Sequence, residues 1–259
     1  MTLSIITPSF NQARFIERTI RSVLSQNYPQ LEYLVVDGGS TDGTIEVLKR
    51  YPQIRWVSEP DHGQSDAVNK GIRMTSGEVI GWINSDDTYA PGAFATALAA
   101  LEANPDAGMV YGDMNVVDHE DRILMRRRSR PFNLRRLILT GASYIFQPTV
   151  FIRREAIEAV GQLDISLRHA MDYDLWIRIG QKFPAVYVPE VLANFRVHPS
   201  SKTCTEIQLQ LKEGREVRAR YIRSPFAKLW FAYYDLRVWA YRHWERYRIS
   251  RSKALETAV

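Results

Sequence analysis

Short apolar runs and amphipathic segments alternate along the first half of the chain. Runs of β-branched and other apolar residues predict buried strands at residues 3–7, 33–36, 54–57 and 79–83. Apolar positions at helical spacing predict helices at residues 13–26, 45–48 and 66–74. Buried strands that alternate with helices are typical of a parallel sheet covered on both faces. We therefore expect an α/β fold that binds its ligands at the carboxyl ends of the strands.

The alternation is less regular in the second half. The pattern there predicts helices at residues 93–103, 153–160 and 172–183. It predicts strands at residues 109–111, 122–125, 147–152, 186–188 and 192–197. No internal repeat or low-complexity segment interrupts it.

Polar residues follow several of the predicted strands directly. Residues 8–11, Asp37 and residues 84–87 come after the first, second and fourth strands, so we expect them on one rim. The adjacent carboxylates Asp86 and Asp87 at a strand end repel each other and lose hydration, and a divalent cation would compensate this cost. The alternative is a solvated acidic turn before the helix that begins near residue 92.

The C-terminal part differs in composition from the rest. Residues 207–259 hold 12 Lys/Arg against 5 Asp/Glu, a net charge of +7, which leaves 5 − 7 = −2 for residues 1–206. After a charged helical pattern at 207–221, residues 226–247 mix aromatic with basic side chains. This is typical of helices in a membrane interface, and the alternative is packing on the domain or on a second subunit. A nucleic-acid-binding core is not expected, because the basic charge is confined to this end.

The remaining global features are ordinary. A single cysteine, Cys204, permits no intrachain disulfide and no cysteine-based zinc cluster, which fits a reducing compartment. We expect no signal peptide and no transmembrane helix, because neither a basic leader nor an apolar run of about 20 residues is present.

Five motifs occur in a characteristic order. They are Thr7-Pro8-Ser9-Phe10-Asn11, Asp37-Gly38-Gly39-Ser40-Thr41-Asp42-Gly43, Asn69-Lys70-Gly71, Asn84-Ser85-Asp86-Asp87, and Met171-Asp172-Tyr173-Asp174-Leu175-Trp176 with Arg178. Together they resemble the family 2 glycosyltransferases over roughly residues 1–200. The resemblance implies a GT-A (Rossmann-like) fold, mixed but mostly parallel, at residues 1–205. A basic, aromatic-rich helical extension follows at 206–259.

The resemblance also implies a function. Family members transfer a sugar from a nucleotide-diphosphate sugar to a glycan or lipid-linked glycan, with inversion, in surface polysaccharide and O-antigen synthesis. We expect a cytoplasmic enzyme that can associate peripherally with the inner membrane face. The alternative is a catalytically inactive nucleotide-sugar-binding partner subunit, suggested by Asn84 and Met171, which replace the acidic residues usual in the family.

Site residues follow from the motifs. The donor is expected to contact Pro8, Ser9, Phe10, Asp37, Asp66, Asn69, Asn84, Ser85 and Asp86. Asp37 would bind the nucleotide base, or else form an Asx turn. Mg²⁺ or Mn²⁺ is expected on Asp86, with Asp87 as a second ligand or a brace. His198 would approach the metal or the diphosphate, and the alternative is a structural histidine.

Asp172 is the expected general base, at the start of a helix. The alternative is a carboxylate that only caps this helix. Tyr173, Asp174 and Trp176 are expected to bind the acceptor. The basic residues 126–130 would either hold an acceptor phosphate or form a solvated loop.

Overall fold

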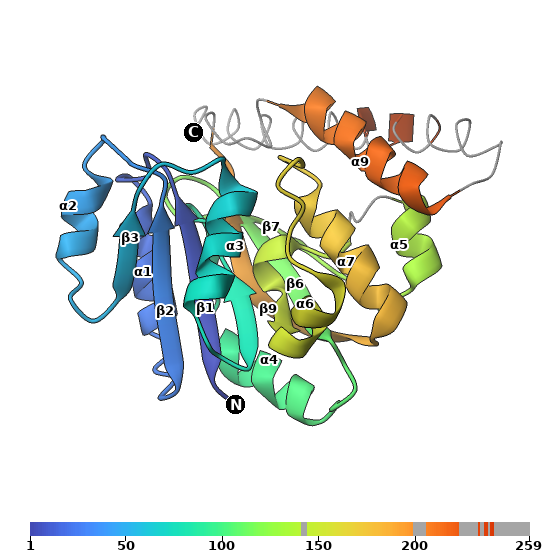
Figure 1. Cartoon of the computed structure of the whole chain (residues 1–259), viewed down its shortest axis with the longest axis horizontal. Coiled ribbons are helices and arrows are strands. Elements are labelled where there is room, and N and C mark those ends of the chain that lie inside the picture. The colour runs from blue at the N-terminus through green and yellow to red at the C-terminus, as the bar shows by residue number, and fades with distance from the viewer. Residues whose placement is uncertain (141–143, 199–205, 223–232, 234–235, 238, 241–259) are drawn as a thin grey trace, which may run out of the picture.

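The computed structural model describes residues 1–140, 144–198, 206–222, 233, 236–237 and 239–240. Residues 141–143, Cys204 and almost all of the aromatic and basic segment 226–247 lie outside this set. A single mixed sheet runs through the described part, with helices on both of its faces (Figure 1).

The N-terminal half of the sheet is parallel. Its strands are β1 (Leu3–Ser9), β2 (Leu31–Asp37), β3 (Arg55–Ser58) and β4 (Val79–Trp82), in the spatial order β3-β2-β1-β4. Leu3 pairs with Leu31 on one side and with Val79 on the other, so these strands begin at one level. Their carboxyl ends consequently form one edge, as the sequence predicted.

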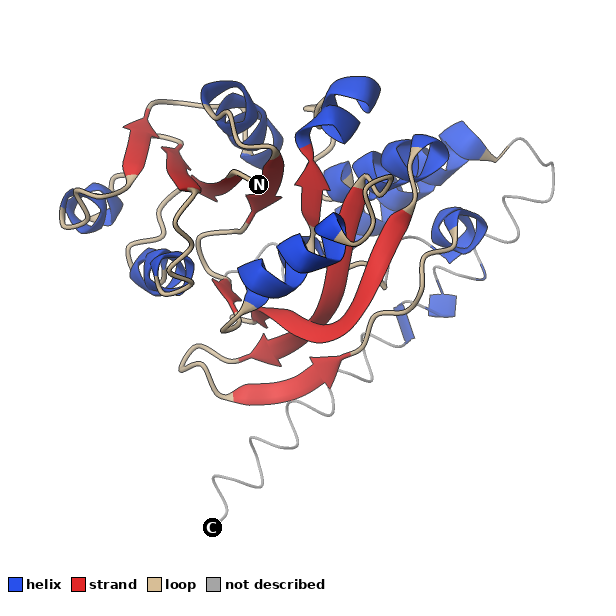
Figure 2. Cartoon of the chain, turned by 90° about the horizontal axis from the view of Figure 1, so that it is seen from below, coloured by secondary structure: helices blue, strands red, loops and turns tan. Residues whose placement is uncertain are grey.

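Further strands, partly antiparallel, complete the sheet (Figure 2). They are β5 (Thr88–Tyr89), β6 (Met109–Val117), β7 (Ile123–Arg127), β8 (Phe151–Arg153) and β9 (Ala185–Arg196). β8 runs antiparallel between β4 and β6, whereas β6 and β9 form a long parallel pair. β8 thus connects the two halves of the sheet.

Two hydrophobic layers cover the faces. Side chains alternate along the strands: Leu34 and Val36 face one layer, and Tyr33 and Val35 the other. The first layer contains α3 (Gln64–Met74), α5 (Leu134–Thr140), α6 (Arg154–Val160), α7 (Met171–Lys182) and α9 (Ile207–Tyr221). The second contains α1 (Ile16–Leu24), α2 (Thr44–Lys49) and α4 (Ala93–Glu102).

Three local predictions differ from the structure. Of residues 147–152, only 151 and 152 lie in a strand, β8, whereas Gln147–Thr149 form the short helix η1, because Pro148 has no N–H for a strand ladder. The strands expected at 186–188 and 192–197 are one strand, β9, whose pairing with β6 shifts register near Asp113. Helix α5 and the two-residue strand β5 were not predicted.

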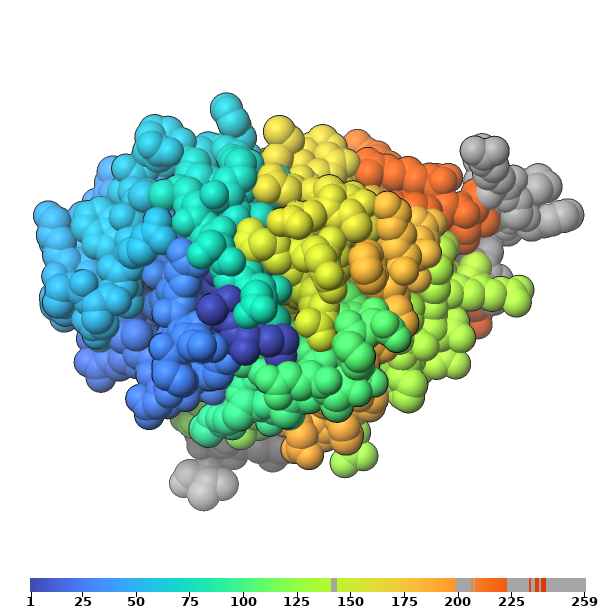
Figure 3. All heavy atoms as spheres, turned by 60° about the horizontal axis from the view of Figure 1, so that its bottom comes forward, coloured from blue at the N-terminus to red at the C-terminus, as the bar shows by residue number. Residues whose placement is uncertain are grey.

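The two halves of the chain pack into one body. In Figure 3 the N-terminal segment (blue to cyan) and the segment from α4 to α7 (green to orange) meet along a continuous surface. Within the described residues, no helix has the length and apolar character needed to cross a membrane.

Candidate active site

The ends of β1 and β2 form the first part of the rim. Ser9 pairs with Asp37 in the parallel register, and Pro8 lies one position earlier in β1. The Ser9 hydroxyl is buried and has no hydrogen-bond partner, whereas Phe10, the next residue, is 59% exposed. A buried hydroxyl without a partner is uncommon in a folded protein and suggests a polar ligand nearby.

Asp37 is held rigidly at the end of β2. One carboxylate oxygen accepts hydrogen bonds from the N–H groups of Gly39 (3.1 Å) and Ser40 (2.8 Å) and from the Ser58 hydroxyl (2.7 Å). The other accepts from the Ser40 hydroxyl at 2.5 Å. The Asx turn considered from the sequence is therefore present. Contact of Asp37 with a nucleotide base stays a prediction.

The end of β4 brings Asp86 and His198 together. Asp86 Oδ2 lies 3.0 Å from His198 Nε2, although the two residues are far apart in the sequence. The Asp86 side chain is 20% exposed, while His198 is nearly buried, with its ring 4.8 Å from that of Phe15. A partly exposed carboxylate beside an imidazole fits a divalent cation whose other ligands come from a diphosphate.

Asp87 points away from this pair. It is fully buried, and its oxygens accept from the Arg196 N–H (2.9 Å) and the Asn84 amide (3.4 Å). Burial and the nearby Asp86 charge raise the pKa of the Asp87 carboxyl well above its usual range. Of the two roles expected for Asp87, these contacts favour the brace, and metal binding by Asp87 stays a prediction. Among the described residues, no three or more His, Cys, Asp or Glu side chains converge on a common point suited to a metal.

Arg196 is the residue of this rim that sequence analysis missed. Its buried guanidinium donates to the backbone carbonyls of Asp86 (2.8 Å) and Asp118 (2.8 Å) and to the Asp121 carboxylate (2.5 Å). Its position two residues before His198 is the only sequence signal for it. By holding the Asp86 backbone, Arg196 fixes one side of the Asp86–His198 pair.

Helix α3 contributes the next part of the rim. Gln64 donates to the Asn84 side-chain oxygen at 2.6 Å, which ties the start of α3 to the end of β4. Asp66, in the first turn, accepts from the His62 N–H at 3.1 Å. Ser85 is buried. Lys70, also on α3, pairs with Glu59 at 2.7 Å.

Asn69 has a different place from the one expected. Its amide donates to the Leu163 carbonyl (2.9 Å) and accepts from the Leu163 N–H (3.0 Å). Both ends of this buried side chain hold the loop between α6 and α7. Its observed contacts are therefore structural, and contact of Asn69 with the donor stays a prediction.

Asp172 lies in the first turn of α7. Its carboxylate accepts the Tyr173 N–H at 2.7 Å, and no side chain caps the helix from the N-cap residue, Ala170. The residue keeps some exposure, yet burial of the carboxyl raises its pKa to about 6. A carboxylate with a pKa near neutrality is suited to general-base catalysis.

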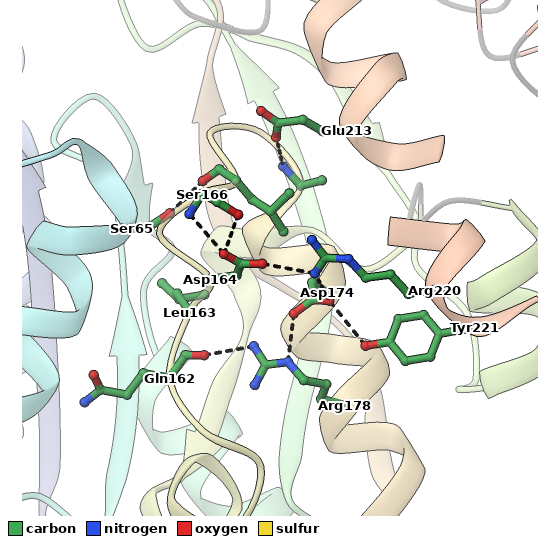
Figure 4. Close-up of polar contacts among 12 residues, drawn as sticks. Ser65, Gln162, Leu163, Asp164, Ser166, Asp174, Arg178, Glu213, Arg220 and Tyr221 are labelled. Atoms are coloured by element: carbon green, nitrogen blue, oxygen red, sulfur yellow. Dashed lines mark hydrogen bonds and ion pairs between the residues drawn. The ribbon is translucent and has the colours of Figure 1, made fainter. Parts of the chain in front are cut away.

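The three residues expected to bind the acceptor are buried and structural. The Tyr173 hydroxyl donates to the backbone carbonyls of Leu137 (3.1 Å) and Ile138 (3.0 Å) in α5. Asp174 is enclosed by cationic and hydroxyl partners on α7 and α9 (Figure 4). Trp176 is fully buried in the core. The contacts observed for these residues are internal ones, and acceptor binding by them stays a prediction.

Trp176 instead connects α7 to the rim. Its ring stacks on Trp82, the last residue of β4, with 5.5 Å between centroids. Asp172 lies one helical turn before Trp176, and Asp86 lies four residues after Trp82 in the chain. In Figure 1 α7 begins at the edge of the molecule where β1 and β2 end. Helix α7, with Asp172 in its first turn, thus begins at the edge of the sheet where the strand-end candidate residues lie.

This arrangement, a mixed sheet whose polar residues gather at the strand ends, is the GT-A fold. S. aureus TarS (residues 1–349) in complex with UDP-GlcNAc superposes with a TM-score of 0.68 at 15% identity, over 90% of this chain and 71% of that one. Mannosyltransferase PcManGT of Pyrobaculum calidifontis, in complex with GDP-Man and Mn²⁺, superposes with a TM-score of 0.66 at 23% identity, over 90% of this chain and 68% of that one.

Sequence comparison identifies the family. The profile of glycosyl transferase family 2 matches residues 4–161, and the chain belongs to this family. It is 31% identical to an uncharacterized glycosyltransferase of Mycobacterium tuberculosis over 75% of this chain and 74% of that protein. It is 26% identical to the chondroitin synthase of Escherichia coli over 80% of this chain, but spans only 31% of that longer protein.

Proposed function

We propose that the protein is an inverting, metal-dependent glycosyltransferase of cell-surface polysaccharide or O-antigen synthesis. It would move a sugar from a nucleotide-diphosphate sugar to a hydroxyl of a glycan or lipid-linked glycan. The observation that carries the proposal is that α7, whose first turn holds Asp172, a carboxyl of raised pKa, begins at the edge of the sheet where β1 and β2 end.

The donor would lie along the strand ends. Pro8, Ser9, Phe10 and Asp37 would enclose the nucleoside, with the exposed Phe10 ring available for stacking and the orphaned Ser9 hydroxyl for a hydrogen bond. The remaining donor contacts would come from Asp66, Asn84, Ser85 and Asp86. The solved structures of TarS with UDP-GlcNAc and of PcManGT with GDP-Man support a donor of this class.

Asp86 and His198 would hold the cation. Bound Mg²⁺ or Mn²⁺ would neutralise the diphosphate and so make it a better leaving group. The partial exposure of the Asp86 carboxylate leaves room for further ligands, while Arg196 holds its backbone in place. The presence of Mn²⁺ in the PcManGT complex supports this assignment.

Asp172 would act on the acceptor. Its ionised carboxylate takes the proton of the acceptor hydroxyl while that oxygen forms a bond to the anomeric carbon. The bond from this carbon to the diphosphate oxygen breaks, and the nucleoside diphosphate leaves with the bonding electrons. A single displacement from the opposite face inverts the anomeric configuration. General-base assistance of this kind contributes about 10²–10⁴ in rate.

The C-terminal residues 206–259 would attach the enzyme to a membrane surface. Their basic and aromatic composition supports a peripheral attachment to the inner face of the cytoplasmic membrane, where lipid-linked acceptors are found. Residues 1–205 would then form the transferase domain of a cytoplasmic enzyme, and the extension would begin with α9.

Two measurements test the proposal. The first is a thermal-shift panel of uridine, guanosine, thymidine, cytidine and adenosine diphosphates, with and without Mn²⁺. The second is nucleoside diphosphate release from the matching sugar donors, with water or with chondroitin and hyaluronan oligosaccharides as acceptors. These oligosaccharides are chosen because a chondroitin synthase and a hyaluronan synthase are relatives.

We expect one nucleotide to stabilise the protein in a metal-dependent way and its sugar donor to turn over. Asp172→Asn should lower turnover by about 10²–10⁴-fold and keep nucleotide binding. Binding without turnover by the unaltered protein would instead support the inactive partner subunit. Absence of binding by any nucleotide would overturn the donor site.

A further inference from the structure

The loop between α6 and α7 leads directly into Asp172 and is held from two sides. On one side α3 fixes it, because the Ser65 hydroxyl donates to the Leu167 carbonyl at 3.0 Å and Asn69 forms a bidentate pair with Leu163. α3 also contacts the rim at Asn84. Through α3, the position of this side of the loop is therefore fixed relative to the end of β4.

On the other side a buried carboxylate of α9 holds the backbone of the loop. Glu213, only 5% exposed, accepts backbone N–H groups from three consecutive residues. These are Arg168 (3.0 and 3.1 Å to its two oxygens), His169 (2.7 Å) and Ala170 (3.1 Å). Hydrogen bonds to an ionised acceptor are about twice as strong as neutral ones. No other side chain in the described chain is shown to accept these three N–H groups.

A second group of contacts joins α9 to α7 itself (Figure 4). Asp174 pairs with Arg178 at 2.7 Å and contacts Arg220 (3.3 Å) and Tyr221 (3.2 Å) of α9. Arg220 also pairs with Asp164 of the loop at 3.0 Å. Because Asp174 lies two residues after Asp172 and Ala170 two residues before it, α9 holds the chain on both sides of the expected base.

We propose that α9 is the element that positions the catalytic base, with Glu213 as its principal positioning residue. The inference rests on the proposed function of Asp172. The buried Glu213 carboxylate fixes the backbone that enters α7, so the Asp172 carboxylate is held in one place before substrates bind. Displacement of a reacting group by about 1 Å can reduce a rate by about 10²-fold, and control of this position is therefore a catalytic property.

The principal test replaces Glu213 by Gln, with Glu216→Gln as the matched control. Both residues lie on α9, but Glu216 is 54% exposed and pairs with Lys212 of the same helix, at 3.9 Å. A glutamine in place of Glu213 would present an NH₂ group to backbone N–H groups that need an acceptor. Kinetics are measured as nucleoside diphosphate release from the donor identified in the panel, and nucleotide affinity by calorimetry.

We expect Glu213→Gln to lower kcat by about tenfold or more while the nucleotide Kd and the donor KM stay within about twofold. Hydrogen exchange of residues 168–170 should become faster, and Glu213→Asp, which restores the carboxylate, should recover part of kcat. Glu216→Gln should match the unaltered enzyme in all of these. In the Asp172→Asn background, Glu213→Gln should have little further effect, because the two residues act through one step.

Several outcomes separate the inference from the proposed function. Faster exchange at 168–170 with an unchanged kcat would make Glu213 a structural tie only and overturn the inference. An equal loss of kcat in the Asp172→Asn background would do the same. Full turnover by Asp172→Asn alone would instead overturn the proposed base, whatever Glu213→Gln does.

A milder variant covers the case in which Glu213→Gln unfolds. Tyr221→Phe removes only one hydrogen bond from α9 to Asp174. A drop in kcat of about threefold at an unchanged nucleotide Kd would support positioning by α9, given that one such bond is worth about 1 kcal/mol. An unchanged kcat for Tyr221→Phe would then count against the inference.

Discussion

Asp172 combines partial exposure with a raised pKa, and its titration should be visible in catalysis. As a general base it is active only when ionised, and burial raises its pKa to about 6. We therefore expect kcat to be constant above about pH 7 and to fall about tenfold per pH unit below pH 6. The measurement is kcat against pH at saturating donor. A flat profile from pH 5 to 8 would contradict the assignment of Asp172 as base.

The same residue should lower the stability of the folded protein. A carboxyl whose folded-state pKa is raised stabilises the fold below its unfolded pKa, near 4, and loses this contribution as pH rises through about 6. Asp172→Asn should therefore raise the free energy of unfolding at pH 8 by roughly 1–3 kcal/mol, so that it melts a few degrees higher than the unaltered protein. The difference should shrink to about a third of this at pH 4.5. Thermal unfolding at the two pH values measures it, and an equal difference at both would exclude ionisation as the cause.

Asp86 should determine the response to metal. Asp86→Ala removes the partly exposed carboxylate next to His198 and leaves the buried brace, Asp87, in place. A nucleoside diphosphate at 100 times its Kd stabilises the folded protein by about 2.7 kcal/mol, which raises the melting temperature. We expect the variant to lose the part of this rise that depends on Mn²⁺. The control is Asp106→Ala, at an exposed position outside the rim. Retention of the full shift by Asp86→Ala would exclude it as a ligand.

Sequence identified candidate residues best where they follow a strand or begin a helix. Asp37, Asp86 and Asp172 were found in this way, because strand ends and helix starts fix a residue's place in an α/β fold. Tyr173 and Trp176 belong to the same motif as Asp172, but the motif does not specify which face of the helix packs on the core. Their burial depends on partners in α5 and β4.

Close packing of α3 on β1 requires a glycine at residue 71. A Cβ there would overlap the Ile6 side chain, whereas at Gly214 of α9 no atom lies within 4 Å of an added Cβ. We expect Gly71→Ala to lower the free energy of unfolding by about 1–3 kcal/mol. Gly214→Ala should raise it by about 0.5–1 kcal/mol, because alanine favours the helix. Chemical denaturation measures both, and equal effects would show that α3 shifts to accommodate the methyl group.

Helices and strands were predicted well where the local pattern of apolar residues alone determines them. The first four strands are short apolar runs between amphipathic helices, and the structure confirms all four. The α5 segment, by contrast, is only seven residues long and buries only Leu137 fully. Its position depends on tertiary contacts, such as the hydrogen bonds from the Tyr173 hydroxyl to its backbone carbonyls. The hydrophobic periodicity of the segment itself does not predict such contacts. The role of Glu213 on α9 was missed for the same reason.

At the scale of the whole molecule, the candidate site spans both halves of the chain. Gln64 and Asn84 connect α3 to the rim, and the Trp82–Trp176 pair connects β4 to α7. Contacts at such sequence separations could not be read from the sequence alone. The order of motifs nevertheless predicted the fold, since all family members share the topology that brings these segments together.

The uneven distribution of charge should direct the whole molecule to anionic surfaces. Residues 223–259 hold 8 Lys/Arg against 3 Asp/Glu, whereas residues 1–206 carry a net −2. Each basic residue near an anionic membrane contributes about 1 kcal/mol. We therefore expect the full chain to sediment with vesicles containing phosphatidylglycerol, and to be released at about 0.5 M salt, where charges are strongly screened.

Replacing Arg242, Arg246, Arg248 and Arg251 by Gln should weaken this binding by about tenfold or more. The matched control replaces four exposed bases elsewhere, Lys49, Arg73, Arg135 and Arg136, for the same change in net charge. If both variants lose binding equally, net charge alone attracts the protein and the extension has no special part. If neither binds less, the attachment is not electrostatic, and the aromatic residues of the extension become the next positions to replace.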